Sequence, residues 1–289
     1  MASLLWPPRA ALQRLALQRL VRQRMVVSVR SSRQHAHSPS AVATSRVRAP
    51  LGSALASGLA VHAGLLAIAP MLPVETQAAP AFIISFTLLS GLGLTVLLWL
   101  LWRNGGPSRF GAANQVTLLR AGMVMLLLTI VLQTPQAEPS WKIVLLASLA
   151  TALDGCDGWL ARRLGLVSAF GARFDMEVDA LLIVALSLLA WRLDQAGPWV
   201  LVCGAIRYVF VLAARPWPWL ARPLPYSRRR QALCVVQVIA LIVCLLPVLA
   251  PPVSGLFALA GLLALSLSFA IDVRWLARRS HAPSEVTTR

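Results

Sequence analysis

Repeated apolar stretches, each about twenty residues long, constrain the fold of this chain more than any other feature. A helix of about 20 residues spans the roughly 30 Å hydrocarbon core of a bilayer, and the sequence supplies that length about eight times. Prolines and short polar segments separate the stretches. The predicted spans are 51–72, 80–102, 115–133, 142–160, 174–191, 197–214, 231–250 and 253–272. We therefore expect an all-α integral membrane protein, a bundle of about eight transmembrane helices.

The composition excludes an ordinary soluble domain. The chain is 58% hydrophobic and only 13% charged, and its mean hydropathy is +0.72. Its net charge of +17 comes from 27 basic residues against 10 acidic ones. Because the basic residues fall between the apolar stretches or at the two ends, they fit membrane topology and anionic headgroups, and no nucleic-acid partner is expected.

The distribution of arginine predicts the orientation. Every second connection between predicted spans is basic, and the first 50 residues hold nine Arg and no acid. Since short cytoplasmic loops carry excess Lys and Arg, both termini are expected in the cytoplasm. The use of Arg with almost no Lys suggests a GC-rich bacterial genome and hence a bacterial inner membrane. The basic segment 1–50 is expected to be a disordered tail; an organellar transit peptide or a misassigned start codon are the alternatives.

Four carboxylates stand out against this apolar background. Asp154 and Asp157 are three residues apart near the end of the fourth predicted span, and Asp175 and Asp179 are four apart near the start of the fifth. Both spacings place a pair on one helix face, and an antiparallel pair of helices joined by a short loop brings the two faces together. Such a hard-oxygen site suits Mg²⁺ or Mn²⁺, with charge enough for two ions, and it lies at the predicted cytoplasmic face.

A divalent-cation transporter is the alternative class, because acids within membrane helices often mark ion pathways. A transporter places such ligands near the bilayer midplane, at broken helices. The four acids lie near one membrane face instead, and small residues follow them. This placement favours an enzyme.

The segment around the acids resembles the CDP-alcohol phosphatidyltransferase family. The family signature is Asp-x-x-Asp-Gly-x-x-Ala-Arg, eight or nine residues, then Gly-x-x-x-Asp-x-x-x-Asp. In this chain its fixed positions are Asp154, Asp157, Gly158, Ala161, Arg162, Gly171, Asp175 and Asp179. The resemblance extends over about residues 110–275, a six-helix catalytic core. It includes a segment similar to the family's Asn-x-x-Thr-x-x-Arg, formed by Asn114, Thr117 and Arg120.

The resemblance implies transfer of a phosphatidyl group from CDP-diacylglycerol, or of a similar group from another CDP-alcohol, to an acceptor hydroxyl with release of CMP. The four Asp would hold two divalent cations, and Asp179 would be the base. The residues expected on the donor side are Gly158, Ala161, Arg162, Gly171, Asn114 and Thr117. The resemblance also implies a homodimer.

The acceptor must be sought outside the signature. Arg120 and Arg207, deep in their spans, together with the run Arg228, Arg229 and Arg230, could bind a phosphorylated alcohol. The alternative is that the run only anchors the chain to anionic headgroups. Glycerol 3-phosphate is the first choice and inositol phosphate the second. Serine or choline comes third, choline with an aromatic cage from Tyr208, Trp217 and Trp219.

These expectations define four segments of the chain. They are a basic tail at 1–50, two extra transmembrane helices at 51–105, the transferase-like core at 106–279 and a C-terminal tail at 280–289.

Overall fold

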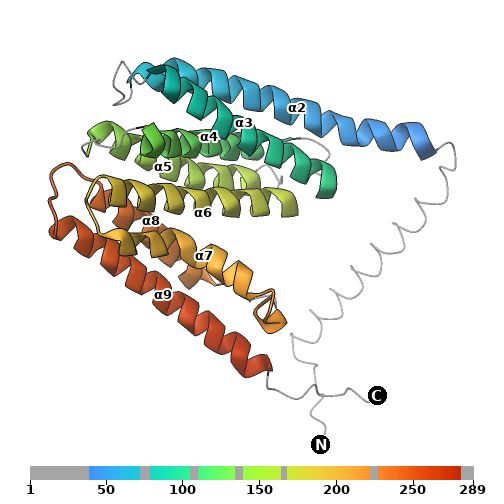
Figure 1. Ribbon diagram of the computed structural model, residues 1–289. Helices are drawn as coiled ribbons and strands as arrows, with labels where there is room; N and C mark the ends of the chain where they lie inside the picture. The colour runs from blue at the N-terminus through green and yellow to red at the C-terminus, as the bar shows by residue number, and fades with distance from the viewer. Residues whose placement is uncertain are drawn as a thin grey trace, which may run out of the picture. The chain divides into compact units, whose positions relative to one another are not determined.

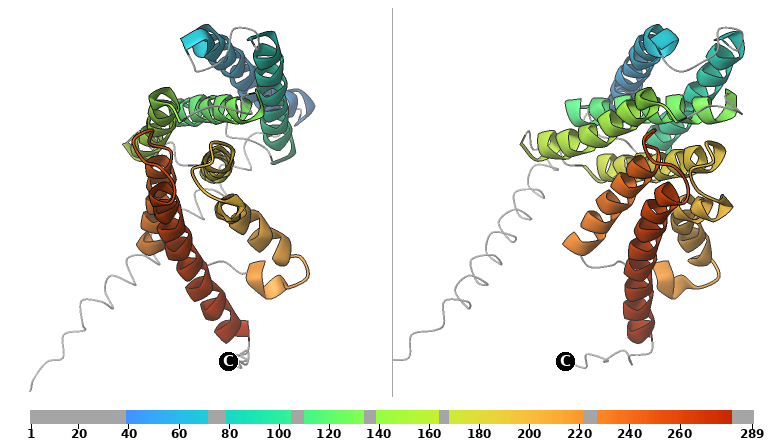
Figure 2. Two further views of the ribbon diagram at one scale, coloured as in Figure 1. Left: turned by 60° about the vertical axis from the view of Figure 1, so that its left-hand side comes forward. Right: turned by 90° about the vertical axis from the view of Figure 1, so that its left-hand side faces the viewer.

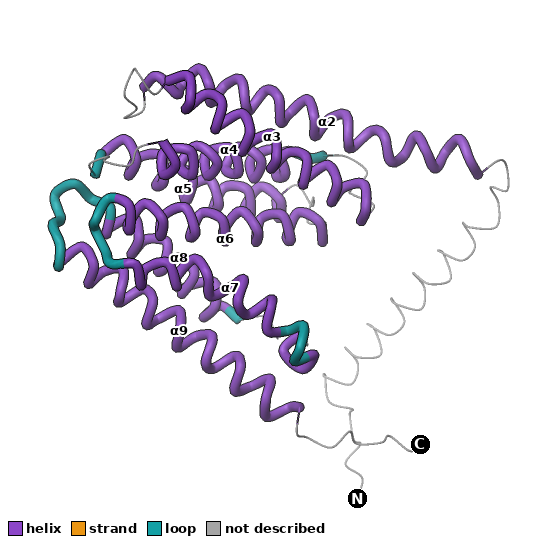
Figure 3. The backbone as a smooth tube through the Cα atoms, in the orientation of Figure 1, coloured by secondary structure: helices purple, strands orange, loops and turns teal. Residues whose placement is uncertain are grey.

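The computed structural model describes residues 39–71, 79–104, 110–133, 139–163, 168–221 and 227–280. The chain divides into two units, Met1–Arg48 and Ala49–Arg289, and of the first unit only the start of one helix is described. Over the described ranges the secondary structure is entirely helical (Figure 3). The expected all-α architecture is therefore confirmed.

Each predicted span corresponds to one α-helix. The helices are α2 (Pro39–Ile68), α3 (Ala79–Asn104), α4 (Ala112–Gln133), α5 (Trp141–Arg163), α6 (Ala169–Arg192), α7 (Leu201–Ala213), α8 (Arg228–Cys244) and α9 (Val253–Ser280). Helix α2 begins at Pro39, inside the segment predicted as tail. Helix α8 ends at Cys244, short of the predicted residue 250, because Pro247 disfavours helical backbone in the residue before it.

Within the described ranges, four segments are long and apolar enough to cross a membrane: Leu51–Met71, Pro80–Arg103, Ala112–Gln133 and Val253–Arg278. The protein is thus an integral membrane protein with several candidate transmembrane helices. Helices α5, α6 and α8 carry the acids and arginines discussed above, and α7 has only 13 residues. Length and composition therefore do not identify these four helices as membrane-spanning. That they also cross the bilayer stays a prediction.

The helices of the second unit are arranged around α4, α5 and α6. Helices α2 and α3 lie on one side of this group, whereas α7, α8 and α9 lie on the other (Figures 1 and 2). The main apolar core is centred on α4, α5, α6 and α8 and also takes in buried residues of α2, α3, α7 and α9. Its fully buried side chains include Leu127, Ile143, Leu186 and Leu241. The predicted six-helix core corresponds to α4–α9, with α2 and α3 added in front of it.

Glycines let neighbouring helices approach closely within this bundle. A Cβ atom on Gly204 of α7 would lie 2.9 Å from the Cα atom of Val184 in α6. A Cβ atom on Gly261 of α9 would lie 2.8 Å from Oε1 of Gln237 in α8. Small residues at such crossings are typical of membrane helices, whose association depends on close packing.

Candidate active site

Helix α4 supplies one wall of the site. Asn114, Thr117 and Arg120 follow one another at intervals of three, so they share a side of the helix, and all three are buried. The Thr117 hydroxyl donates a hydrogen bond to the carbonyl of Ala113 at 3.1 Å. Arg120 is only 1% exposed, which requires that its charge be compensated locally.

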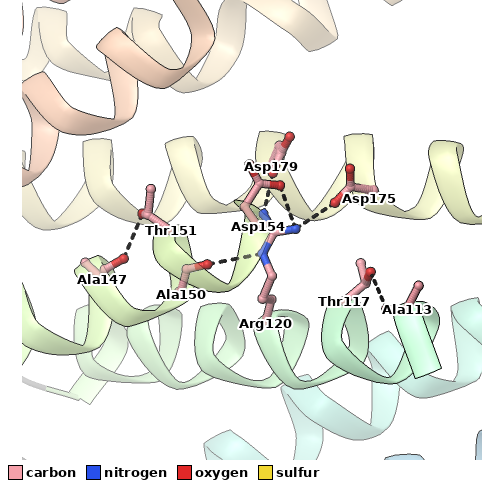
Figure 4. A network of polar contacts seen from close by, with 9 residues as sticks. All are labelled: Ala113, Thr117, Arg120, Ala147, Ala150, Thr151, Asp154, Asp175 and Asp179. Carbon is pink, nitrogen blue, oxygen red and sulfur yellow. Dashed lines mark hydrogen bonds and ion pairs between the residues drawn. The ribbon is translucent and has the colours of Figure 1, made fainter. Parts of the chain in front are cut away.

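Arg120 joins the three helices α4, α5 and α6 through their polar groups (Figure 4). Its Nη1 atom lies 2.9 Å from Oδ1 of Asp154 and 2.6 Å from Oδ1 of Asp175. Its Nη2 atom lies 2.5 Å from Oδ1 of Asp179. Its Nε atom donates a hydrogen bond to the carbonyl of Ala150 at 3.1 Å. One planar guanidinium therefore holds acids from both halves of the signature in fixed positions.

The charge of this cluster favours binding of a further cation. The carboxylates of Asp154, Asp175 and Asp179 bring three negative charges against the single positive charge of Arg120. They stay accessible, with 33%, 36% and 31% of their side chains exposed. One oxygen from each lies within 4.8 Å of the others, and a set of carboxylate oxygens is the donor type that Mg²⁺ and Mn²⁺ prefer.

Several predicted site residues lie on helices that reach this cluster. The side chains of Asp157, Ala161 and Arg162 are outside the described part of the structure; their backbone continues α5 beyond Asp154. Gly158 is half-buried on the same helix. The structure thus brings together three of the four predicted metal ligands and leaves the fourth undescribed.

The packing at the start of α6 explains why the signature has a glycine at position 171. Ser168 caps the helix, and its hydroxyl accepts a hydrogen bond of 2.9 Å from the N–H of Gly171. A Cβ atom on Gly171 would lie 2.9 Å from Oδ1 of Asn114 and 3.1 Å from the Ser168 hydroxyl oxygen. Gly171 therefore lets α6 approach α4, one turn before Asp175.

Further ion pairs lie outside the cluster, and the first joins α6 and α7. Arg207 of α7 pairs with Glu177 of α6. Glu177 is two positions from each of Asp175 and Asp179 along the helix, which turns it to the opposite face of α6. Both residues line an apolar cavity of about 850 Å³.

The second pair joins α8 and α9. Arg229 Nη2 lies 2.7 Å from Oδ1 of Asp272, and Arg230 Nη1 lies 3.6 Å from the same oxygen. The side chain of Arg228 is outside the described part. Sequence reasoning missed Asp272, although an acid in an apolar span is itself a signal that a basic partner lies nearby. It also assigned Arg120 to the acceptor, whereas the guanidinium binds three carboxylates.

Comparison with known proteins agrees with this geometry. The profile of the family described as CDP-alcohol phosphatidyltransferase matches residues 110–271, more than half of the 289 residues. The chain belongs to this family. It is accordingly a transferase of phospholipid synthesis that uses a CDP-alcohol donor and an alcohol acceptor. No curated protein and no solved structure matches the chain. Helices α2 and α3 precede the matched segment.

Proposed function

We propose that this CDP-alcohol phosphatidyltransferase transfers a phosphatidyl group from CDP-diacylglycerol to the hydroxyl of a small phosphorylated alcohol, with glycerol 3-phosphate as the first choice. Asp154, Asp157, Asp175 and Asp179 would hold two Mg²⁺ or Mn²⁺ ions. The convergence of carboxylates from α5 and α6 on Arg120 carries this proposal, since it gathers oxygen ligands and an excess of negative charge at one accessible point.

The bound cations would neutralise charge on the donor pyrophosphate and on the departing CMP. Asp179 would accept the proton of the acceptor hydroxyl as its oxygen attacks the β-phosphorus of the donor. The bond between that phosphorus and the oxygen of CMP breaks, and CMP leaves with the electron pair. Arg120 would act as a positioning residue, because its bond to Oδ1 of Asp179 fixes the orientation of that carboxylate.

The predicted donor-side residues would line the site around these carboxylates. Gly158 and Ala161 would leave room for the nucleotide along α5, and Arg162 would contact phosphate oxygens. Asn114 and Thr117 on α4, with Gly171 opposite Asn114, would line the site from the other helix.

We propose that the acceptor phosphate binds at Arg228, Arg229 and Arg230, at the start of α8. Nη1 of Arg229 is buried and has no hydrogen-bond partner among the described residues, and Nη2 of the same guanidinium pairs with Asp272. Arg120 and Arg207, the other two acceptor candidates, already bind carboxylates, so a phosphate would have to displace one of these. Inositol phosphate, serine or choline as acceptor, and a soluble CDP-alcohol donor with a lipid acceptor, remain alternative substrates.

The membrane setting is proposed from the sequence. Eight spans with both termini in the cytoplasm would place the carboxylates at the cytoplasmic face of a bacterial inner membrane. The family suggests a homodimer.

The test is product analysis with the purified full-length chain. CDP-diacylglycerol and Mn²⁺ are offered with glycerol 3-phosphate, inositol 1-phosphate, serine or choline in separate reactions, and the lipid product is identified by mass spectrometry. Phosphatidylglycerol phosphate as the main product supports the proposal. A product only with another acceptor, or only with a soluble CDP-alcohol donor, would replace it. Absence of any product, with divalent-cation uptake into proteoliposomes, would establish the transporter alternative.

A further inference from the structure

An apolar cavity of about 850 Å³ lies between the two added helices and the family core. Its walls come from α2, α3, α4 and α6, with Arg207 added from α7, and none of the three clustered carboxylates lines it. On α6 the cavity side carries Phe174, Glu177 and Leu181, the face opposite to Asp175 and Asp179. The cavity is therefore separate from the proposed active site.

The cavity has the length of one membrane leaflet. Its lining runs from Leu118 to Leu128 on α4, which corresponds to about 15 Å at 1.5 Å per residue. Half of a bilayer core of about 30 Å has the same depth. A single acyl chain lying along α4 would fit this length.

The apolar part of the cavity lining favours hydrocarbon over water. Leu, Val, Phe, Met and Gly dominate the lining. The polar pair in its deeper part is already satisfied, since the Ser90 hydroxyl lies 2.8 Å from Nδ1 of His62 and donates to the carbonyl of Phe86 at 2.6 Å. A buried water needs two to four polar partners, which these walls do not offer, whereas hydrocarbon needs none.

The other end of the cavity is charged. It is lined by Arg173 and Glu177 from the first three turns of α6 and by Arg207 from α7. Arg207 pairs through Nη2 with Glu177, while its Nε atom is buried and has no hydrogen-bond partner in the part of the chain that the structure describes. Arg173 is exposed. Two guanidinium groups against one carboxylate favour an anion at this end.

We propose that the cavity binds a bilayer phospholipid with an anionic headgroup, one acyl chain lying between α3 and α4 and the phosphate at Arg173 and Arg207. This lipid would be a bound structural lipid beside α2 and α3. It is not the substrate, because α6 separates it from the carboxylate cluster. The proposal does not rest on the proposed function.

Two glycines of α3 provide a matched test. A Cβ atom on Gly93 would enter the cavity, where its nearest neighbour is Cε of Met125 at 3.4 Å. Gly91, two residues earlier, is exposed and has no atom within 4 Å of such a Cβ atom. The Gly93→Phe variant should fill the cavity, whereas Gly91→Phe adds the same ring outside it.

The experiment is photolabelling of the purified full-length chain in phosphatidylcholine nanodiscs that contain a trace of phosphatidic acid with a diazirine in one acyl chain. Labelled peptides are mapped by mass spectrometry and referenced to those of the lipid-facing side of α9. We expect labels on the cavity-lining parts of α3 and α4, and about tenfold weaker labelling in Gly93→Phe if the phenyl ring displaces about two methylenes of the chain. Gly91→Phe should label as the wild type does. Equal labelling of the two variants would overturn the proposal.

Further variants and probes test whether the loss of labelling reflects misfolding, whether the headgroup must be anionic, and whether labelling depends on the transferase reaction. Ala121→Leu fills the cavity from the α4 wall and should reproduce the loss, which separates filling from misfolding of α3. A phosphatidylcholine probe should label the wild type more weakly than the phosphatidic acid probe does. The phosphatidic acid probe should likewise label Arg173→Gln more weakly than the wild type. Equal labelling in these comparisons would refute the anionic headgroup. Asp179→Ala should keep the labelling, so a failure of this proposal is distinguishable from a failure of the proposed transferase reaction.

Discussion

Nη2 of Arg120 lies 2.5 Å from Oδ1 of Asp179, so a buried guanidinium from the first helix of the family core holds the last carboxylate of the signature. The same guanidinium reaches Asp154 and Asp175. Arg120 therefore links the Asn-x-x-Thr-x-x-Arg segment to the acidic signature, two motifs that are separate in the sequence. Both the stability of the site and its geometry depend on this residue.

Replacing Arg120 by Gln should destabilise the protein strongly. The change removes a buried guanidinium that pairs with three carboxylates, and breaking a buried ion pair costs about 3–5 kcal/mol. Because the carboxylates are partly exposed, the expected loss is about 3 kcal/mol. Thermal melting in detergent measures it. Added Mn²⁺ should recover more stability in this variant than in the wild type, because cations replace the missing charge.

Arg274→Gln is the matched control, since Arg274 is exposed on α9. Its melting temperature should equal that of the wild type. An unchanged melting temperature for Arg120→Gln would show that Arg120 is not the counter-ion of the cluster.

The sequence predicts the helices and the metal ligands for simple physical reasons. Apolar stretches of bilayer length leave helix as the only efficient way to satisfy their backbone, and acids three or four residues apart must share a helix face. The partner of each arginine could not be predicted in the same way. Arg120, Arg207 and Arg229 find Asp154, Glu177 and Asp272 only through helix crossings, which depend on tertiary approach.

Substitution of Gly171 by Ala should displace α6. Its Cβ atom would meet Oδ1 of Asn114 at 2.9 Å and the Ser168 hydroxyl oxygen at 3.1 Å, so the helix or both side chains must move. We expect a loss of stability of about 1–3 kcal/mol, typical of overpacking, together with a lower kcat. Melting curves and CMP release measure the two effects.

Gly64→Ala serves as the comparison, because nothing lies within 4 Å of a Cβ atom there. Alanine favours helix over glycine by about 1 kcal/mol, so this variant should be neutral or slightly more stable. If Gly171→Ala behaved like Gly64→Ala, the close approach of α4 and α6 would not be needed.

Replacing Arg229 by Gln tests the acceptor site. Loss of a hydrogen bond to a charged group is worth about 1.5–3 kcal/mol, so the KM for glycerol 3-phosphate should rise about ten- to a hundredfold while the KM for the donor changes little. Asp272→Asn should raise the same KM by a smaller factor, because the carboxylate only orients Arg229. Steady-state kinetics with each substrate varied in turn supplies the values. Equal changes in both KM values would indicate a structural role instead.

Asp179→Ala should abolish turnover while donor binding persists. Loss of a general base costs about 10²–10⁴-fold in rate, whereas the remaining carboxylates can still hold a cation against the pyrophosphate. Binding of CDP-diacylglycerol in Mn²⁺, measured with a radiolabelled donor, should stay within a few fold of the wild type. Full activity in this variant would refute the assignment of Asp179.

The sharpest test of the metal centre is CMP release by the purified full-length chain with CDP-diacylglycerol and glycerol 3-phosphate, measured over a titration of Mn²⁺ into metal-free protein. We predict no release without the cation, release that saturates with Mn²⁺, and none at any Mn²⁺ concentration in Asp175→Asn, whose carboxylate lies 2.6 Å from Arg120 in the cluster. Release that is independent of the cation, or that Asp175→Asn retains in full, would contradict the claim that these carboxylates form the metal centre of the transferase.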